Sequence, residues 1–219
     1  PPPQMKKVFV TGGSGFVGKN LLKQLHSRGI EINALARSST SINTVRSLGA
    51  NPIEGDLGNF NAFLKGCEGC DTVFHVAAKV EIEGPLEEFR KLNVIATRDL
   101  LKAARQSGVK CFVHCSTEAV LVGGASLTNV DETYPYPDKP AGPYPLTKGE
   151  AERVVLEAYK EAQKDKDADF RAVIVRPRMI YGPGDTVLLP AILKMVESGQ
   201  FKWISGGDYL SSVTHVRNV

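Results

Sequence analysis

The chain has few of the residues that mark a disulfide scaffold, a membrane protein or a nucleic-acid-binding protein. Four cysteines among 219 residues are too few for a disulfide framework in a chain of this size. The longest apolar run, Val187 to Leu193, contains Pro190 and is far short of a membrane span. The net charge is 27 − 24 = +3, which gives no reason to expect a nucleic-acid partner.

The first residues also lack the apolar segment of a signal peptide. Residues 1–4 are interpreted as a short lead-in or a cloning remnant, with Met5 as the natural start. A chain with few cysteines and no such segment is typical of a reducing compartment, so we expect a cytoplasmic protein. Its apolar and charged fractions, 42% and 23%, are those of a chain that folds around an ordinary core.

The segment Val8 to Gly18 gives the first indication of function. An apolar run ends at Thr11, a turn with Gly12, Gly15 and Gly18 follows, and an amphipathic pattern begins directly behind it. This order predicts a strand, a tight turn and a helix N-terminus whose free amides bind a pyrophosphate. We expect Gly12 to permit the turn, Gly15 to let a ligand approach the backbone, and Gly18 to let the helix pack against the sheet. At this point a purely structural glycine turn is the alternative.

Strand and helix patterns alternate along the rest of the chain. Further strands are predicted over 30–36, 51–53, 71–78, 110–115 and 170–176, and helices over 16–28, 41–48, 59–65, 86–106 and 144–163. The alternation predicts an α/β fold with a doubly wound parallel sheet. A surface loop is predicted over 123–143 and a solvated turn over 164–167. Beyond residue 182 the pattern is irregular, with a helix over 186–196 and a strand over 200–204.

The end of the second predicted strand bears on the choice of dinucleotide. A site that prefers NAD usually has an acid there for the ribose hydroxyls, whereas an arginine accommodates the 2′-phosphate of NADP. No acid ends this strand, and Arg37 is followed by Ser38, Ser39 and Thr40. We therefore expect NADP, with Arg37 as a solvated loop residue as the alternative.

Two polar groups could carry chemistry. Tyr144 and Lys148 are four residues apart in a predicted helix and so share one face. The ammonium is expected to stabilise the phenolate and lower the pKa of Tyr144, which gives a proton donor and acceptor for carbonyl and alcohol chemistry. Ser116 and Thr117 directly follow a predicted strand, where a hydroxyl can bind a substrate oxygen. Taken singly, a surface Tyr–Lys pair and a turn hydroxyl are the alternatives.

Other polar groups are interpreted as structural. Cys67 and Cys70 have redox or zinc spacing, but no second cysteine pair or histidine cluster completes a site, so we predict no metal. His75 and His114 lie in predicted strands and are expected to be core residues or to have their hydrogen bonds satisfied. One charged face of the last long helix is predicted to be solvated: Glu150, Glu152, Arg153, Glu157, Lys160 and Glu161.

Taken together, these motifs resemble the extended short-chain dehydrogenase/reductase family, also called the NAD-dependent epimerase/dehydratase family. The resemblance runs from Lys6 to Val219, and its finer placement is with the 3β-hydroxysteroid dehydrogenase and dihydroflavonol reductase branch. It rests on these ordered segments: Thr11–Gly18, Gly55–Leu57, His75–Ala78, Asn93–Thr97, Ser116–Thr117, Tyr144 with Lys148, and Arg176–Pro177 leading into Tyr181–Asp185.

The resemblance implies a Rossmann domain over 5–181 that binds NADP, with NAD as the less favoured cofactor, and the start of a substrate-binding region over 182–219. It implies that Tyr144 is the general acid/base, that Lys148 holds the nicotinamide ribose and tunes Tyr144, and that Thr117, or Ser116 beside it, orients the substrate. Asn93 is expected to anchor the long helix behind the site. The implied cofactor contacts are Gly12, Gly15, Phe16, Val17, Gly18, Arg37, Asp56, Leu57, Ala77, Ala78, Tyr144, Lys148 and Pro177.

These expectations favour an oxidoreductase that interconverts a secondary alcohol and a ketone on a small apolar molecule. A nucleotide-sugar epimerase or dehydratase uses the same Tyr–Lys pair and is the first alternative; a non-catalytic cofactor sensor or scaffold is the second. Members of the family generally continue past the motif at His215 to Val219, so a truncated form, a split gene product or a naturally short form is expected. The segment Val187 to Leu193 would then be uncovered and favour a homo-oligomer.

Overall fold

The computed structural model describes residues 5–81, 83–164, 169–208 and 211–219. It divides into two compact units, one that ends at Arg176 and one that begins at Pro177. The expected lead-in at 1–4 and most of the expected turn at 164–167 lie outside the described residues. The boundary expected at residue 181 separates a cofactor-binding from a substrate-binding region, and this functional division stays a prediction.

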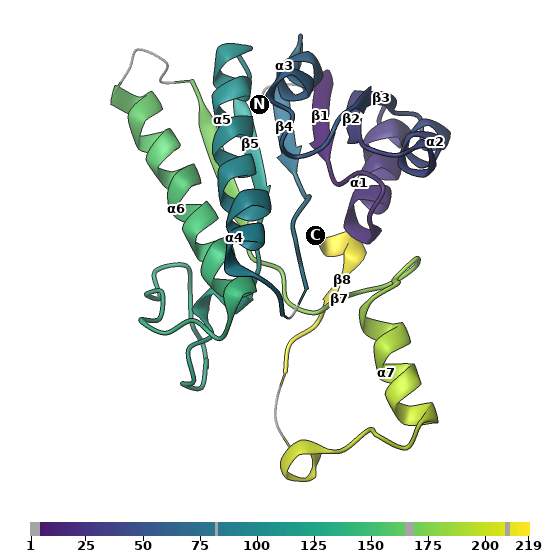
Figure 1. Cartoon of the computed structure of the whole chain (residues 1–219), viewed down its shortest axis with the longest axis vertical. Coiled ribbons are helices and arrows are strands. Elements are labelled where there is room, and N and C mark those ends of the chain that lie inside the picture. The colour runs from purple at the N-terminus through teal and green to yellow at the C-terminus, as the bar shows by residue number, and fades with distance from the viewer. Residues whose placement is uncertain (1–4, 82, 165–168, 209–210) are drawn as a thin grey trace. The chain divides into compact units, whose positions relative to one another are not determined.

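The first unit is built on a six-stranded parallel sheet in the order β3-β2-β1-β4-β5-β6, which confirms the predicted fold class (Figure 1). Its strands are β1 (Lys7–Thr11), β2 (Glu31–Ala36), β3 (Asn51–Glu54), β4 (Thr72–His75), β5 (Cys111–Cys115) and β6 (Arg171–Val175). The order reverses at β1, which pairs with both β2 and β4. In open sheets of this kind ligands bind beyond the carboxyl ends of the strands at that reversal.

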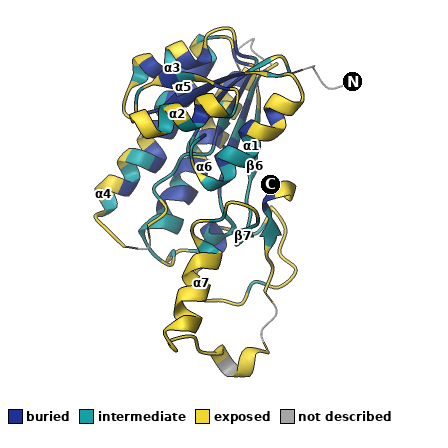
Figure 2. Ribbon diagram, turned by 90° about the vertical axis from the view of Figure 1, so that its right-hand side faces the viewer, coloured by how far each residue is buried: buried dark blue, intermediate teal, exposed yellow. Residues whose placement is uncertain are grey.

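Helices pack on both faces of this sheet because successive strand residues point to opposite sides. Val8 and Val10 of β1 share one core cluster with Leu22 of α1 (Phe16–Ser27) and Val45 of α2 (Ser39–Ser47). Phe9, between them, lies in the other cluster, which also contains residues of α3 (Phe60–Cys67), α5 (Ala96–Gln106) and α6 (Pro143–Lys164). Figure 2 shows the buried strands between helices whose outer sides are exposed.

The helix predicted over 86–106 is one continuous run of three parts. It begins with α4 (Leu86–Phe89), passes through a π-helical segment, Arg90–Ile95, and ends with α5. A π-helical turn is rare, and it is frequent at functional sites because it redirects side chains within a helix. Here the segment contains Asn93, whose contacts are described below.

Two predicted strands differ from the structure. β4 ends at His75 rather than at residue 78. The N–H of Val76 makes the last backbone hydrogen bond to β1, to the carbonyl oxygen of Thr11 at 3.3 Å, and the N–H of Lys79 donates to the side chain of Asn93 instead. The strand predicted over 200–204 is wrong. In this segment the rings of Phe201 and Trp203 pack edge to face, with their centroids 5.2 Å apart, and a short 3₁₀ turn, Ile204–Gly207, follows.

The second unit contains a parallel pair of very short strands, β7 (Ile180–Tyr181) and β8 (Thr214–His215). Two-residue strands leave no alternation in a sequence, so neither was predicted. The helix α7 (Leu188–Glu197) begins where the Asp185 carboxylate accepts three backbone N–H bonds, and it contains no buried residue. Figure 2 shows it as an exposed helix. None of the described helices is both long and apolar enough to cross a membrane.

Candidate active site

The glycine turn after β1 is tightly closed on one side and open on the other. Gly12 has a φ of +75°, and a Cβ on it would lie 2.7 Å from the backbone nitrogen of Ala77. Gly15 donates its N–H to Gly12 at 3.0 Å, and a Cβ on Gly15 would meet only that carbonyl oxygen. A Cβ on Gly18 would collide with the backbone of Gly12 and Gly13. Gly18 thus packs against the turn itself, not against the sheet as predicted.

The start of α1 is suited to an anion. Gly15 is its N-cap, no side chain caps it, and its first turn contains no acid. The first amides of a helix have no partner within the helix, so those of Phe16 and Val17 can donate to a ligand. The open side of Gly15 provides the close approach that a pyrophosphate requires. The residues present therefore fit the phosphates of a dinucleotide.

The other predicted cofactor residues lie around the carboxyl ends of β2, β3 and β4. Arg37 is exposed directly after β2, while the hydroxyl of Ser38 caps α2 by accepting the N–H of Ser41 at 3.2 Å. Asp56 accepts the N–H of Gly58 at 2.8 Å and so holds its own turn. Leu57, next to it, is partly buried and packs against the core cluster that contains Phe9.

The small residues after β4 are half-buried, and the structure brings one of them to the glycine turn. Ala77 and Ala78 both follow the end of β4, and the backbone of Ala77 faces Gly12. Pro177 begins the second unit, so its expected place against a nicotinamide stays a prediction.

Tyr144 and Thr117 meet where β5 ends. Thr117 begins a short 3₁₀ segment, Glu118–Leu121, and its hydroxyl accepts the N–H of Ala119 at 3.2 Å. Burial raises the pKa of Tyr144 to about 12, and a side-chain hydrogen bond with Thr117 opposes that rise. The expectation of a lowered pKa is therefore wrong for this structure, because burial penalises the phenolate more than its polar neighbours stabilise it.

Lys148 lies one turn further along α6, fully buried, and is directed at β5. Its Nζ donates to the carbonyl oxygen of Cys115 at 2.8 Å and lies 3.2 Å from Nε2 of His114. Burial lowers the pKa of Lys148 to about 8, against opposing effects of Cys115 and Glu152. The causes that shift the pKa of Tyr144 are burial, Thr117, Cys115 and Glu118, and the ammonium of Lys148 is not among them.

Ser116, the alternative to Thr117, is buried, and its N–H donates to Val175 at 2.8 Å. Its hydroxyl has no hydrogen-bond partner within the described residues. A buried hydroxyl in that state is uncommon and is suited to a ligand atom. Of the two hydroxyls, Thr117 is the one in contact with Tyr144.

A buried polar network supports the site from behind. Asn93 accepts the N–H of Lys79 at 2.8 Å, and its amide donates to the carbonyl oxygen of Lys79 and to Oγ1 of Thr147, each at 3.1 Å. The side chain thus connects the segment after β4 to the first turn of α6, which carries Tyr144. This is the anchoring position expected for Asn93.

A second buried cluster was missed by the sequence reasoning. Glu152, expected on a solvated face, is fully buried. Its carboxylate accepts from Arg176 Nε at 3.0 Å, from Arg176 Nη2 at 2.6 Å and from the Tyr136 hydroxyl at 2.6 Å. Glu152 is eight residues after Tyr144 and four after Lys148, and that spacing, which places all three on one helix face, was the available signal.

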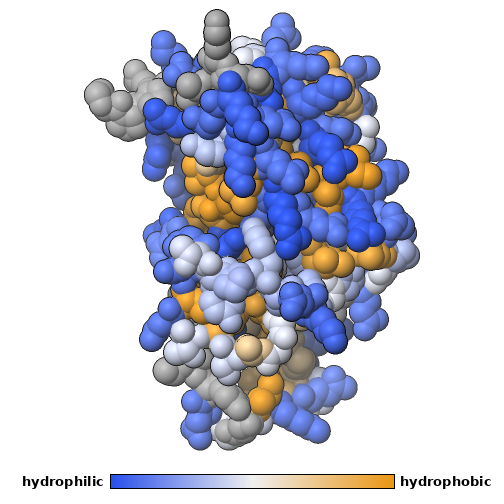
Figure 3. All heavy atoms as spheres, turned by 90° about the vertical axis from the view of Figure 1, so that its left-hand side faces the viewer, coloured by the Kyte–Doolittle hydropathy of each residue, from blue (hydrophilic) through white to orange (hydrophobic). Residues whose placement is uncertain are grey.

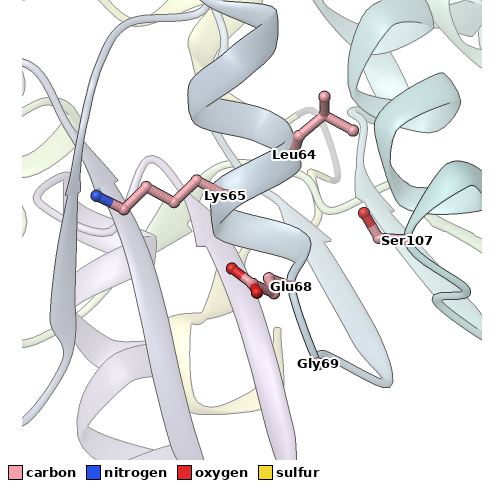
Figure 4. Close-up of a pocket in the computed structure, with 5 residues that line it drawn as sticks. All are labelled: Leu64, Lys65, Glu68, Gly69 and Ser107. Atoms are coloured by element: carbon pink, nitrogen blue, oxygen red, sulfur yellow. The ribbon is translucent and has the colours of Figure 1, made fainter.

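Two hollows on the described surface lie away from these groups. One, of about 330 Å³, is lined by Leu64, Lys65, Glu68, Gly69 and Ser107 (Figure 4). The other, of about 530 Å³, lies between α5 and α6. Neither hollow is lined by a predicted site residue, so the strand ends remain the candidate site.

The face of the molecule that carries α6 shows apolar patches among hydrophilic side chains (Figure 3).

The cysteine pair belongs to the core. Cys67 and Cys70 are buried, and burial raises the pKa of Cys67 to about 12 and that of Cys70 to about 11. Both thiols therefore stay protonated and unreactive at neutral pH. Among the described residues, no cluster of three histidine, cysteine, aspartate or glutamate side chains could hold a metal ion.

A parallel sheet of this order, with a glycine turn after its first strand, is the architecture of dinucleotide-binding Rossmann domains. The model of the 3-beta hydroxysteroid dehydrogenase/isomerase family matches residues 9–219, and the chain belongs to that family. This confirms the resemblance to the extended short-chain dehydrogenase/reductases and to their 3β-hydroxysteroid dehydrogenase branch.

Relatives within this group are named as reductases and dehydrogenases. The chain is 43% identical over 213 residues to a 4-hydroxy-2-methyl-3-oxo-4-farnesyl-3,4-dihydroquinoline-1-oxide ketoreductase of Stigmatella aurantiaca, with 97% of this chain covered. It is 33% identical over 219 residues to a decarboxylating sterol-4-alpha-carboxylate 3-dehydrogenase of Dictyostelium discoideum, with 98% covered. Among solved structures, MoeE5 in complex with UDP-glucose and NAD matches with a TM-score of 0.77 and 28% identity, covering 96% of this chain and 68% of that one.

The chain spans 62% of the length of the Stigmatella relative and 65% of the length of the Dictyostelium relative.

Proposed function

We propose that the chain carries the cofactor-binding and catalytic groups of an NAD(P)-dependent oxidoreductase. The reaction interconverts a secondary alcohol and a ketone on a small, largely apolar molecule. The observation that carries the proposal is the cluster at the end of β5, where the half-buried Tyr144 has a side-chain hydrogen bond with Thr117 and the buried Lys148 lies one turn further on. The ketoreductase and the sterol dehydrogenase among its relatives support the substrate class.

The cofactor would be held by this chain's own backbone and a few side chains. The first amides of α1 and the open side of Gly15 would hold the pyrophosphate. Lys148 would donate to the nicotinamide ribose, and Ala77 and Ala78 would leave room beside the glycine turn. When bound, the dinucleotide supplies or accepts the hydride.

The protein's part in the reaction is a proton transfer at the substrate oxygen. Thr117 would donate a hydrogen bond to that oxygen, and Tyr144 would give its proton to it during ketone reduction. Because the pKa of Tyr144 is near 12, the phenol keeps its proton at neutral pH. An alkoxide is a stronger base than a phenolate, so the transfer from Tyr144 to the reduced oxygen runs downhill. The protonated phenol is the form that ketone reduction requires, and alcohol oxidation uses the same groups in the reverse order.

NADP is proposed as the preferred dinucleotide, with Arg37 at its 2′-phosphate. The exposed guanidinium after β2 and the lack of an acid there support this choice. Arg37→Ala should weaken NADPH binding about tenfold, which corresponds to the loss of one hydrogen bond to a charged group. NADH binding should not change. The matched control is Arg28→Ala, an exposed arginine at the end of α1; equal effects of Arg37→Ala on both cofactors would contradict the assignment.

The second candidate is a nucleotide-sugar epimerase or dehydratase, which the solved complex of MoeE5 with UDP-glucose and NAD favours. Such an enzyme keeps its cofactor through the reaction. Cofactor that copurifies without exchange, together with binding of UDP- or dTDP-sugars, would support it over the oxidoreductase. A non-catalytic sensor needs neither a hydrogen-bonded Tyr–Thr pair nor a buried lysine, so nothing in the site favours that alternative.

The direct test is Tyr144→Phe. Turnover of a ketone panel with NADPH should fall by about 10²- to 10⁴-fold, the usual contribution of a general acid, while NADPH affinity stays the same. Tyr159→Phe, an exposed tyrosine on the same helix, is the matched control and should have no effect. A Tyr144→Phe variant that reduces its substrate at the wild-type rate would rule out the mechanism.

A further inference from the structure

His114 lies on β5, two residues before Ser116, and is fully buried. Its Nε2 is 3.2 Å from Nζ of Lys148, and its Nδ1 has no hydrogen-bond partner in the part of the chain that the structure describes. Buried polar atoms without a partner are rare, because each has given up its hydrogen bond with water. The hydrogen bonding of this ring is therefore directed at Lys148.

The neighbouring ring, His75 on β4, is bound quite differently. Its Nδ1 lies 2.7 Å from Oγ1 of Thr11 and its Nε2 lies 2.9 Å from Oγ1 of Thr97. The Thr97 hydroxyl donates to the Asn93 carbonyl oxygen at 2.6 Å, so it accepts from Nε2–H of His75. His75 is thus fixed in one neutral tautomer, and the 5.3 Å between the two ring centroids leaves it in contact with His114 as an uncharged neighbour.

His114 has no comparable constraint, so its proton can follow the charge of Lys148. When Lys148 is an ammonium, Nε2 must accept, and the ring proton is on Nδ1. When Lys148 has released its proton to solvent, the amine lone pair can accept a bond from Nε2–H, and the proton is better placed there. The ring stays neutral in both states, since burial and the charge of Lys148 hold the pKa of His114 well below its usual value.

We propose that His114 is a positioning residue for Lys148: its ring accepts from the ammonium and changes tautomer when the lysine becomes neutral. The proposal rests on the proposed function only in that Lys148 matters for the cofactor's ribose. The pairing itself belongs to the protein without cofactor.

The other titratable groups around Lys148 define when this exchange takes place. Cys115 on β5 is a neutral thiol, because burial raises its pKa. Tyr144 on α6 is a neutral phenol below its pKa of about 12. Glu152, one turn further along α6, favours the ammonium and is itself paired with Arg176. With the pKa of Lys148 lowered to about 8, the neutral amine becomes accessible just above neutral pH.

The experiment is an NMR titration of the unliganded chain from pH 6 to 10. Carbon-13 labelling of the lysine Cε reports the charge of Lys148, whose resonance is assigned by its loss in Lys148→Met. Long-range nitrogen-15 correlations report the histidine tautomers. In the wild type, His114 should change from the Nδ1–H to the Nε2–H form with the same midpoint as Lys148, while His75 keeps its tautomer.

Three variants separate the hydrogen bond from packing. His114→Phe removes the ring's bond to Lys148 in both charge states. Because the bond to the ammonium is the stronger of the two, the midpoint of Lys148 should fall by about 0.7 pH unit. His114→Gln returns an acceptor near the position of Nε2 and should restore most of that shift. Phe112→Leu, a buried change on the same face of β5, should leave the midpoint unchanged.

An unchanged Lys148 midpoint in His114→Phe, or no restoration by His114→Gln, would overturn the proposal. If the phenylalanine variant does not fold, the wild-type titration decides alone. A His114 tautomer that stays the same while Lys148 titrates would show that the two groups are not paired. None of these readouts requires turnover, so a failure here is separate from a failure of the proposed reaction.

Discussion

Glu152→Gln should lower the free energy of unfolding of the first unit by about 3 kcal/mol. The carboxylate is fully buried and accepts from both Arg176 and Tyr136. Removal of one partner from a buried ion pair costs about 3–5 kcal/mol, because the other charge is left uncompensated. The Arg176 side chain is 19% exposed, so water stabilises it in part and the low end of that range applies. For a unit of this size, about 3 kcal/mol corresponds to a decrease of roughly 6–12 °C in the melting temperature.

The matched variant is Tyr136→Phe, which removes one hydroxyl and leaves the ion pair in place. It should cost about 1–2 kcal/mol, because the hydroxyl donates to Glu152 at 2.6 Å and accepts from Arg176 Nη2 at 3.2 Å. Urea unfolding followed by circular dichroism gives both values, and the double variant gives their coupling. Tyr136 lies in the segment that joins Thr117 to Tyr144, so Tyr136→Phe should also speed amide hydrogen exchange over residues 122–142.

The outcome that would refute this reasoning is a Glu152→Gln variant no less stable than Tyr136→Phe. The charge of Glu152 would then contribute nothing beyond its hydrogen bond with Tyr136. A coupling energy near zero between the two changes would likewise show that the hydroxyl and the carboxylate act independently.

Two further predictions follow from the glycine turn and from Lys148. Gly15→Ala should lower stability only slightly, because its Cβ would meet the Gly12 carbonyl oxygen alone, at 3.3 Å, and it should weaken NADH and NADPH binding alike by tenfold or more. Gly18→Ala should destabilise the fold by about 1–3 kcal/mol, because its Cβ collides with the turn. Thermal unfolding and cofactor titration of both variants check this. Burial lowers the pKa of Lys148 from 10.5 to about 8, so between pH 8 and 9.5 the unfolded chain holds a proton that the native chain has released, and stability from this group rises with pH. In urea unfolding, Lys148→Met should lack that rise; equal pH slopes for the two proteins would contradict it.

The sheet could be predicted because each strand carries its own local signal. β1, β2 and β5 are apolar runs bounded by glycine or polar turns, and the structure places them within a residue or two of the predicted positions. β7 and β8 could not be predicted, because two residues carry no period. The run 200–204 is rich in residues that favour strands, yet a strand needs a partner, and sequence propensity does not provide one.

The sequence could predict which side chains of the candidate site lie near one another, but not their pKa values. The spacing of Tyr144 and Lys148 predicts one face of a helix, and the structure places both on α6, with the hydroxyl of Thr117 after β5 hydrogen-bonded to Tyr144. The pKa of each group depends on the depth at which it is buried, which no local pattern contains. The same limitation led to the expectation that Glu152 would be solvated, since a glutamate in a charged segment usually is.

The charges of the site follow from burial more than from pairing. Burial favours the neutral form of any titratable group. It raises the pKa values of Tyr144 and Cys115 and lowers that of Lys148, so near pH 8 it favours the neutral form of all three. Of these three groups, Lys148 is the one that changes its charge near pH 8, because its pKa is lowered to about 8. A cofactor that carries phosphates would favour the ammonium, so Lys148 should take up a proton on binding above pH 8. The charge of the proposed site would then depend on the ligand that it holds.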